Sequence, residues 1–175
     1  MREKIIECAL GLVDMHGIKF TLDDVAVTLR ISKKTIYKHF KNKEDLINAI
    51  IDFVFADIHK QHQQILKKDI SDVEKLKMIV TVYPSVIHFD TLKLNKLIEL
   101  HPKIYERINK QLFDNWDLTL EMFDKCVENG SMRPISRECF RTVLLGIYDR
   151  AIHYEDHEKM TEECVDAVFN GFVNS

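Results

Sequence analysis

Residues that interrupt helices are scarce in this sequence. Its 175 residues include five glycines and three prolines, and nowhere do apolar and polar residues alternate over a sustained stretch. Such alternation is typical of a half-buried strand, whereas the apolar residues here recur at helical spacing. We therefore predict an all-α fold, with enough apolar content to bury a sizeable core in one domain, or in a small domain fused to a larger one.

Segments that would direct the chain to a membrane are also missing. No N-terminal apolar run is of the signal-peptide type, and no span of about 18 apolar residues is present. We expect a cytoplasmic protein without a membrane partner. Cys8, Cys126, Cys139 and Cys164 lie far apart and form no C-x-x-C pair, so we interpret them as reduced residues rather than as a redox switch or a metal site.

The familiar catalytic motifs are absent as well. The sequence has no G-x-S-x-G, H-E-x-x-H, P-loop or glycine-rich dinucleotide turn, and its glycines are isolated. His59 with His62, and His153 with His157, could each place two imidazoles on one helical face. Nothing supplies a fixed third ligand, so we predict solvated histidines, no metal and no cofactor. The sequence does not predict an enzyme.

Charge is distributed unevenly along the chain. Residues 1–45 contain nine Lys and Arg against seven Asp and Glu, a net charge of +2, whereas residues 46–175 contain 16 against 21, a net charge of −5. The two parts are therefore expected to meet different partners, and contact with nucleic acid is expected only of the N-terminal part.

Two short helices are predicted between residues 21 and 43. Thr21 with Asp24 three residues later forms a capping-box pattern, and Ser32 repeats the N-cap about ten residues further on. So short a spacing leaves room for a turn and nothing else, which indicates a helix-turn-helix. Asn42 is the expected cap of the helix that follows.

The second of these helices has two different faces. Ile36 and Phe40 lie four residues apart on an apolar side. Between Thr28 and Lys43 there are six basic residues and no acidic one. A short helix with such an outer face suits a major groove and its flanking phosphates. The residues expected on that face are Lys33, Lys34, Thr35, Lys38 and His39.

Sixteen positions between residues 3 and 47 form an ordered pattern that is much rarer than a generic pair of helices. They are Gly17, Thr21, Asp24-Val25-Ala26, Ile31-Ser32, Thr35-Ile36-Tyr37, His39-Phe40 and Lys43-Glu44-Asp45-Leu46. These residues resemble the DNA-binding domain of TetR-type transcriptional regulators. The resemblance implies a homodimer that binds an operator in double-stranded DNA, more as a repressor than as an activator. The candidate DNA-binding residues are Thr21, Ser32, Lys33, Lys34, Thr35, Tyr37, Lys38, His39 and Lys43.

Their roles are expected to differ. Residues that point from the recognition helix are expected to include a base reader, while Thr21, Tyr37, His39 and Lys43 mainly hold phosphates. For His39 the alternative is simple packing beside the neighbouring aromatic rings. Arg30 departs from the family, which usually has glycine in the turn. Either the turn tolerates a residue with a side chain, or Arg30 adds a phosphate contact.

The rest of the chain is predicted to be helical, which gives about nine helices in all. A rod from Lys43 to about Lys67 connects a helix-turn-helix domain (residues 1–45) to a ligand-binding and dimerisation domain (residues 46–175). Helices are then expected to begin at Ser71, at Asp90 or Thr91, at Pro102, at Ser136 and near Met160. The one from Pro102 to Val127 is expected to be long and continuous.

Two functions of the C-terminal domain stay open. It encloses a small hydrophobic effector that releases DNA, or it only dimerises or recruits a protein partner. Large, adaptable side chains suit an apolar pocket but equally suit a plain core, and the family resemblance favours the pocket. The candidate ligand-binding residues are Met78, Tyr83, His88, Phe89, Phe113, Trp116, Met122 and Tyr148. The expected dimer interface contains Val143, Ile147, Val165, Val168 and Phe172.

Overall fold

The computed structural model describes residues 1–86, 101–114 and 116–173, without the side chains of 112–114. The described residues contain nine α-helices, a short 3-10 helix and no strand, which confirms the all-α prediction. The helix expected near residues 90–100 lies outside the described residues. The elements are α1 (Arg2–His16), η1 (Gly17–Lys19), α2 (Leu22–Leu29), α3 (Lys33–Tyr37), α4 (Lys43–Leu66), α5 (Asp72–Val80), α7 (Pro102–Asp114), α8 (Asp117–Glu128), α9 (Arg137–Ala151) and α10 (His157–Phe172).

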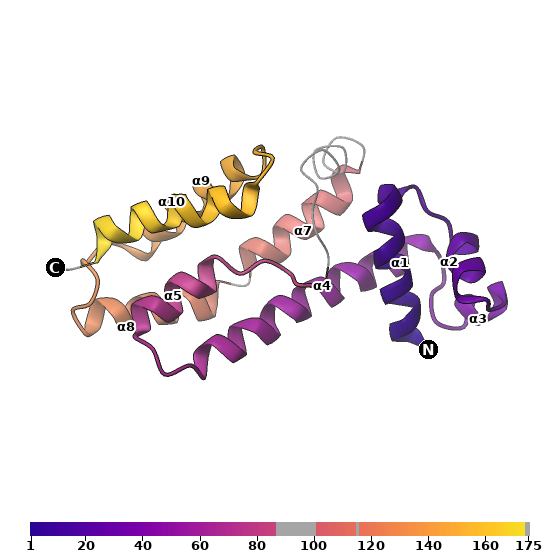
Figure 1. The fold of residues 1–175 in the computed structure, drawn as a ribbon, viewed down its shortest axis with the longest axis horizontal. Coiled ribbons are helices and arrows are strands. Elements are labelled where there is room, and N and C mark those ends of the chain that lie inside the picture. The colour runs from indigo at the N-terminus through magenta and orange to yellow at the C-terminus, as the bar shows by residue number, and fades with distance from the viewer. Residues whose placement is uncertain (87–100, 115, 174–175) are drawn as a thin grey trace.

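The molecule is elongated, and α4 runs along much of its length (Figure 1). Helices α1 to α3 form a module at one end, whereas α5, α8, α9 and α10 gather at the other. Helix α7 lies beside α4 between the two groups. None of the described helices is both long and apolar enough to span a membrane.

Side-chain caps begin most of the helices. The oxygens of Thr21, Ser32, Asn42, Ser71 and Ser136 each accept a hydrogen bond from the backbone N–H three residues later. Each cap satisfies one of the N–H groups that a helix leaves unpaired at its start. The predicted starts of α2, α3, α4, α5 and α9 are therefore confirmed.

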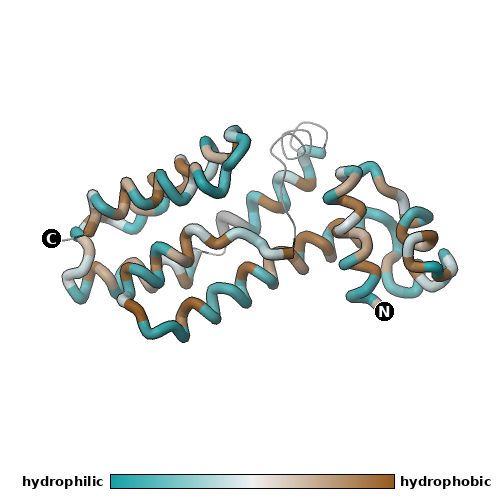
Figure 2. Tube along the Cα trace, viewed as in Figure 1, coloured by the Kyte–Doolittle hydropathy of each residue, from teal (hydrophilic) through white to brown (hydrophobic). Residues whose placement is uncertain are grey.

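Two apolar clusters make up the core, and α4 contributes to both. The first cluster joins buried residues of α1, α2 and α3 to α4 from Leu46 to Phe55. The second joins Ile65 of α4 to buried residues of α5, α8, α9 and α10. Figure 2 shows the apolar segments of α1 and of the adjoining part of α4 next to one another. The boundary at residues 45/46 stays a prediction.

The single long helix predicted from Pro102 to Val127 is wrong. The chain instead forms α7 and α8, which are separated around Trp116. Asp114 and Asn115 have weak helix propensity because their short side chains compete for backbone hydrogen bonds. The two halves also pack on different partners: Ile104 and Ile108 lie against the first cluster, whereas residues of α8 are buried in the second.

Arg30 ends α2 in a left-handed conformation. Its φ is 53° and its ψ is 42°, and it is the only residue other than glycine with positive φ among those described. Its backbone N–H donates to the Val27 carbonyl at 3.1 Å, and the N–H of Ile31 donates to the Ala26 carbonyl at 3.0 Å. These bonds satisfy helix-terminal carbonyls, so the turn tolerates arginine at the cost of an unfavourable backbone conformation.

Replacing Arg30 with glycine should therefore stabilise the protein. Relief of the left-handed strain is worth about 1 kcal/mol, partly offset by the larger entropy of glycine in the unfolded chain. Urea unfolding should show a higher midpoint for Arg30→Gly and no gain for the matched variant Arg30→Ala, which loses the charge but keeps a Cβ. Equal midpoints for the two variants would contradict the inference that the left-handed conformation of Arg30 is strained.

Candidate nucleic-acid interface

Helices α2 and α3 are held at a fixed angle by a shared apolar contact. Val25 and Ala26 of α2 and Ile36 of α3 are buried in the first cluster. Between the helices lie Arg30, Ile31 and Ser32. Local backbone hydrogen bonds set this turn, and the core behind it fixes both helices, so the outer face of α3 is presented rigidly.

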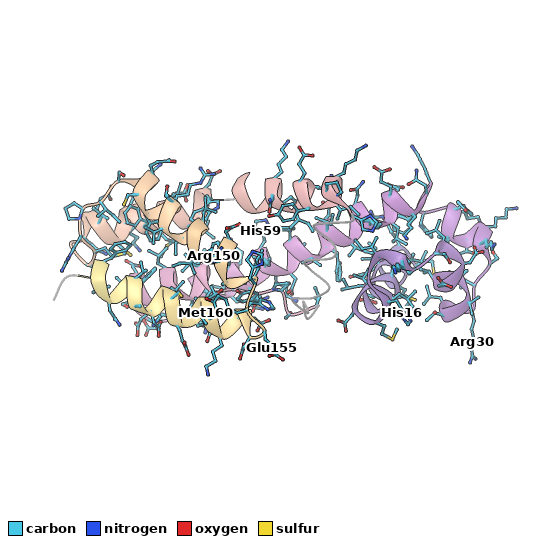
Figure 3. All side chains as sticks on the ribbon, turned by 90° about the horizontal axis from the view of Figure 1, so that it is seen from above. His16, Arg30, His59, Arg150, Glu155 and Met160 are labelled. Atoms are coloured by element: carbon cyan, nitrogen blue, oxygen red, sulfur yellow. The ribbon has the colours of Figure 1, made fainter. Side chains whose placement is uncertain are left out.

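The outer face of α3 carries most of the predicted contact residues. Ser32, Lys33, Lys34, Tyr37, Lys38 and His39 are exposed, and Thr35 is partly buried. Tyr37 stands out because this large residue is 55% exposed. Figure 3 shows the Arg30 side chain projecting from the same end of the molecule. The structure thus brings these side chains together on one surface at the far end of the module.

The cations on this surface are not equivalent. Lys33 forms a salt bridge with Asp23 of α2, and this carboxylate raises the pKa of the lysine. Lys34 and Lys38 form no salt bridge within the described part of the chain. In the free protein Lys34 and Lys38 therefore offer their charge directly to a phosphate or a base edge, whereas Lys33 must first exchange partners.

Two of the predicted polar contacts are already engaged as caps. The Thr21 hydroxyl donates to Asp24 Oδ2 at 2.8 Å and accepts from the Asp24 N–H at 3.1 Å. Hydrogen bonds from the Thr21 backbone and side chain lower the pKa of Asp24. The Ser32 hydroxyl similarly accepts from the Thr35 N–H at 3.2 Å. Thr21 and Ser32 thus position the helices whether or not they also meet DNA.

Lys43 lies differently from the other basic residues. Its side chain is half-buried, its ammonium donates to the Ile18 carbonyl, and its Nζ lies 4.9 Å from the centre of the Phe20 ring. Burial lowers the pKa of this lysine. Its predicted phosphate contact stays a prediction, but in the free protein it also ties the start of α4 to the segment between α1 and α2. Local sequence patterns could not have revealed a contact between residues 25 positions apart.

The predicted ligand-binding residues fall into two groups. Trp116 and Met122 are buried in the second cluster, and the ring centroids of Trp116 and Tyr148 are 6.4 Å apart. Met78 and Tyr83 instead line a hollow of about 400 Å³ that is open to solvent. His88, Phe89 and the side chain of Phe113 lie outside the described residues. The described members of the predicted set therefore divide between a packed cluster and an open hollow, and their role in ligand binding stays a prediction.

The predicted interface residues also differ in exposure. Val165 is 0% exposed within the single chain, so it has no surface left for a second subunit. Ile147 and Phe172 are partly buried and pack against the second cluster. Val143 and Val168 are partly buried without belonging to either cluster.

The position of Lys43 leads to a test with two measurements. Lys43→Ala should lower the free energy of unfolding by about 1 kcal/mol, because it removes a hydrogen bond and a cation–π contact. Lys34→Ala, which removes an exposed lysine without a salt bridge, should leave that free energy within about 0.5 kcal/mol. Urea unfolding of both variants would separate the structural role from any role in DNA binding. Unchanged stability in Lys43→Ala would contradict the contact.

Known proteins share this arrangement. Residues 5–50 match the model of bacterial regulatory proteins of the tetR family. The uncharacterised HTH-type transcriptional regulator YvaF of Bacillus subtilis is 24% identical over 99% of this chain and 96% of its own length. The biofilm operon icaADBC negative transcriptional regulator IcaR of Staphylococcus epidermidis is 26% identical over 71% of this chain and 75% of its own length.

A solved structure extends the likeness to the whole fold. A transcriptional regulator of the TetR/AcrR family from Thermobifida fusca superposes with a TM-score of 0.70 at 19% identity, covering 99% of this chain and 98% of that one. The match to the family model lies on the module that carries the basic face. The similarity to the two curated regulators extends over most of the chain. Together these similarities support a DNA-binding transcriptional regulator of the TetR family, whose family model matches residues 5–50 of this chain.

Proposed function

We propose that this regulator is a repressor that binds a palindromic operator as a homodimer and is released by a small effector. The observation that carries the DNA contact is the outer face of α3, where Lys34 and Lys38 are exposed without a salt bridge and Tyr37 and His39 lie beside them. The proposal of repression is supported by the similarity to IcaR, which is described as a negative regulator.

A dimer follows from the size of the reading surface. Helix α3 has five residues, so one copy can contact only a few base pairs. Specificity over a genome then requires two copies, related by a two-fold axis and spaced about one helical turn of DNA or a multiple of it. Helices α9 and α10 are the proposed contact, centred on Val143, Ile147, Val168 and Phe172, with Val165 supporting them from within.

Release by an effector rests on the way α4 is connected. This helix begins at the module that carries α3 and ends in the second cluster, so a ligand bound near its far end can alter its direction. Such a ligand must bind the DNA-incompetent form more tightly, by about 1.4 kcal/mol for each tenfold loss of operator affinity. The division into residues 1–45 and 46–175 is part of this proposal.

A second candidate function omits the effector. Trp116, Met122 and Tyr148, which were expected to line an apolar pocket, pack with other side chains of the second cluster, and the Tyr148 hydroxyl donates to the Val80 carbonyl at 2.7 Å. A filled core favours a C-terminal domain that only dimerises or recruits a protein partner.

DNA binding is tested first by selecting bound fragments from the native genome. With an operator in hand, Lys34→Ala or Lys38→Ala should each weaken binding. A lysine that holds a phosphate should lower the salt slope by about one, whereas a base reader should cost about 1–3 kcal/mol at a single operator position. Glu163→Gln on α10 is the control. If both lysine variants bind as tightly as the wild type at physiological salt, the assigned face is wrong.

The dimer is tested by a charge placed in the proposed contact. Val168→Arg should dissociate the dimer at micromolar concentration, because an unpaired charge would be desolvated between subunits. Sedimentation of the variant should show a monomer that still has helical circular dichroism. Asn170→Arg, at an exposed position of the same helix, is the matched control and should remain dimeric. A wild-type protein that sediments as a monomer without DNA would contradict the proposal.

A further inference from the structure

A polar hollow lies where α4, the end of α5 and the start of α10 meet. It has a volume of about 400 Å³ and is open to solvent. Its lining includes Gln61 of α4 and Lys68 just beyond the end of that helix. It also includes Met78 and Tyr83, at and after the end of α5, and Glu158 and Glu162 of α10. It lies among the C-terminal helices, apart from α3, and contains neither Trp116 nor Tyr148. The chemistry of this lining differs from that of the expected hydrophobic pocket.

The two glutamates give the hollow an excess of negative charge. Glu158 and Glu162 are four residues apart on α10, a spacing at which like charges repel one another. Neither forms a salt bridge with any described residue. Lys68 is the one basic residue in the lining, and its Nζ lies 3.8 Å from the Met78 sulfur. The lining therefore contains one ammonium and two carboxylates, and a bound cation would offset the repulsion between Glu158 and Glu162.

The neutral groups of the hollow are also suited to a cation. Both N–H groups of the Gln61 amide are used, one to Asp57 Oδ2 at 3.0 Å and one to the Tyr83 carbonyl at 2.9 Å, so its remaining atom is an acceptor oxygen. The Tyr83 hydroxyl is bonded to Thr161 at 2.6 Å, which leaves the ring for contact with a ligand. An aromatic face attracts a cation through its quadrupole. Burial raises the pKa of Tyr83, and the charges of Glu158 and Glu162 raise it further.

An independent observation comes from the residue behind Tyr83. His157 is 6% exposed, and its ring meets the Tyr83 ring edge-on, with centroids 5.5 Å apart. Its Nδ1 is buried and has no hydrogen-bond partner among the described residues. Buried nitrogens in folded proteins are nearly always bonded, so this atom, which lies behind the lining rather than in it, has a hydrogen-bonding capacity that the described part of the chain does not satisfy.

We propose that the hollow binds a small organic cation, with its ammonium group held by Glu158 and Glu162 beside the ring of Tyr83. The apolar part of the ligand would lie against Ile65 and Val82, which also line the hollow. The inference rests on the proposed effector-responsive regulation and names the ligand class and the site. An amine-bearing ligand thus takes the place of the hydrophobic effector expected from the sequence.

Such a ligand would contact both the helix that leads to the DNA-binding module and a helix of the proposed dimer contact. The hollow is lined by α4, which leads to α3, and by α10, which belongs to the proposed dimer contact. Tyr83 already bridges them, since its carbonyl accepts from Gln61 and its hydroxyl bonds to Thr161 of α10. A cation bound between Glu158, Glu162 and Tyr83 would therefore act on the hydrogen bonds that Tyr83 makes with Gln61 and Thr161.

The test is an NMR titration of the full chain with hexylammonium, which is charged at neutral pH, and with hexanol as its neutral counterpart. Hexylammonium should bind at one site, at least tenfold more tightly than hexanol. Glu158→Gln and Glu162→Gln should each weaken it by about tenfold, because each removes a charged hydrogen-bond acceptor. Lys68→Gln should tighten it.

Glu163→Gln is the matched control, since this glutamate lies on α10 outside the hollow and pairs with Lys159. It should bind hexylammonium like the wild type, and circular dichroism should show every variant folded. Equal affinities for hexylammonium and hexanol, or an unchanged affinity in the Glu158→Gln, Glu162→Gln double variant, would overturn the proposal.

Operator affinity separates this inference from the proposed function. Failure of the ligand-free protein to bind any genomic fragment would remove the proposed function and leave the titration result standing. Hexylammonium that binds through the two glutamates without changing operator affinity would keep the site and remove its regulatory role. A change in affinity that the Glu158→Gln, Glu162→Gln double variant abolishes supports both.

Discussion

The fold depends on the burial of one helix in two cores. Helix α4 places Leu46, Ile50 and Val54 in the first cluster and Ile65 in the second. A module of α1 to α3 alone is under 50 residues, and at that size a domain buries too little surface to be stable without support. Because the same helix completes both cores, the module has a fixed direction relative to the C-terminal helices, and its orientation follows that of α4.

Polar contacts also hold the middle of α4, through side chains that are not buried in the apolar clusters. On one side Asp52 accepts from Arg107 at 2.8 Å and from Gln111 at 3.0 Å, both on α7. On the other side the Asp57 carboxylate accepts from the backbone N–H of Ser85 at 2.6 Å. Hydrogen bonds of this kind can exchange partners with little loss of apolar burial, so this part of the helix is easier to shift than its two ends.

Local features were predictable from sequence, and distant contacts were not. The caps at Thr21, Ser32 and Asn42 each involve residues three apart, so their chemistry is visible in a short window. The sequence did not predict the separation of α7 from α8, because the helical spacing of apolar residues continues through Trp116. The two helices nevertheless pack against different apolar clusters. The inward position of Lys43 and the bond between Tyr83 and Thr161 join residues 25 and 78 positions apart, and no periodicity encodes them.

The candidate site shows the same division. The basic outer face of α3 follows from helical spacing together with the family resemblance, whereas the pairing of Lys33 with Asp23 required the angle between α2 and α3. The described residues that were expected to line an apolar pocket divide between the second cluster and an open hollow, because large side chains satisfy a core and a pocket equally well. Composition could name the residues that fill the C-terminal domain, but only the packing tells which of them face an opening.

The length of α4 determines how small a change at the hollow can matter. A helix of 24 residues is about 36 Å long at 1.5 Å per residue, so a tilt of about 5° at one end moves the other by roughly 3 Å. In the proposed dimer, two recognition helices would meet grooves about 34 Å apart, and hydrogen bonds to base edges weaken over a few tenths of an ångström. The proposed ligand would therefore need only to redistribute the polar contacts of Asp57, Gln61 and Tyr83. Under the proposed mechanism, the apolar cores would remain closed while the spacing of the two α3 helices in the dimer ceased to fit the operator.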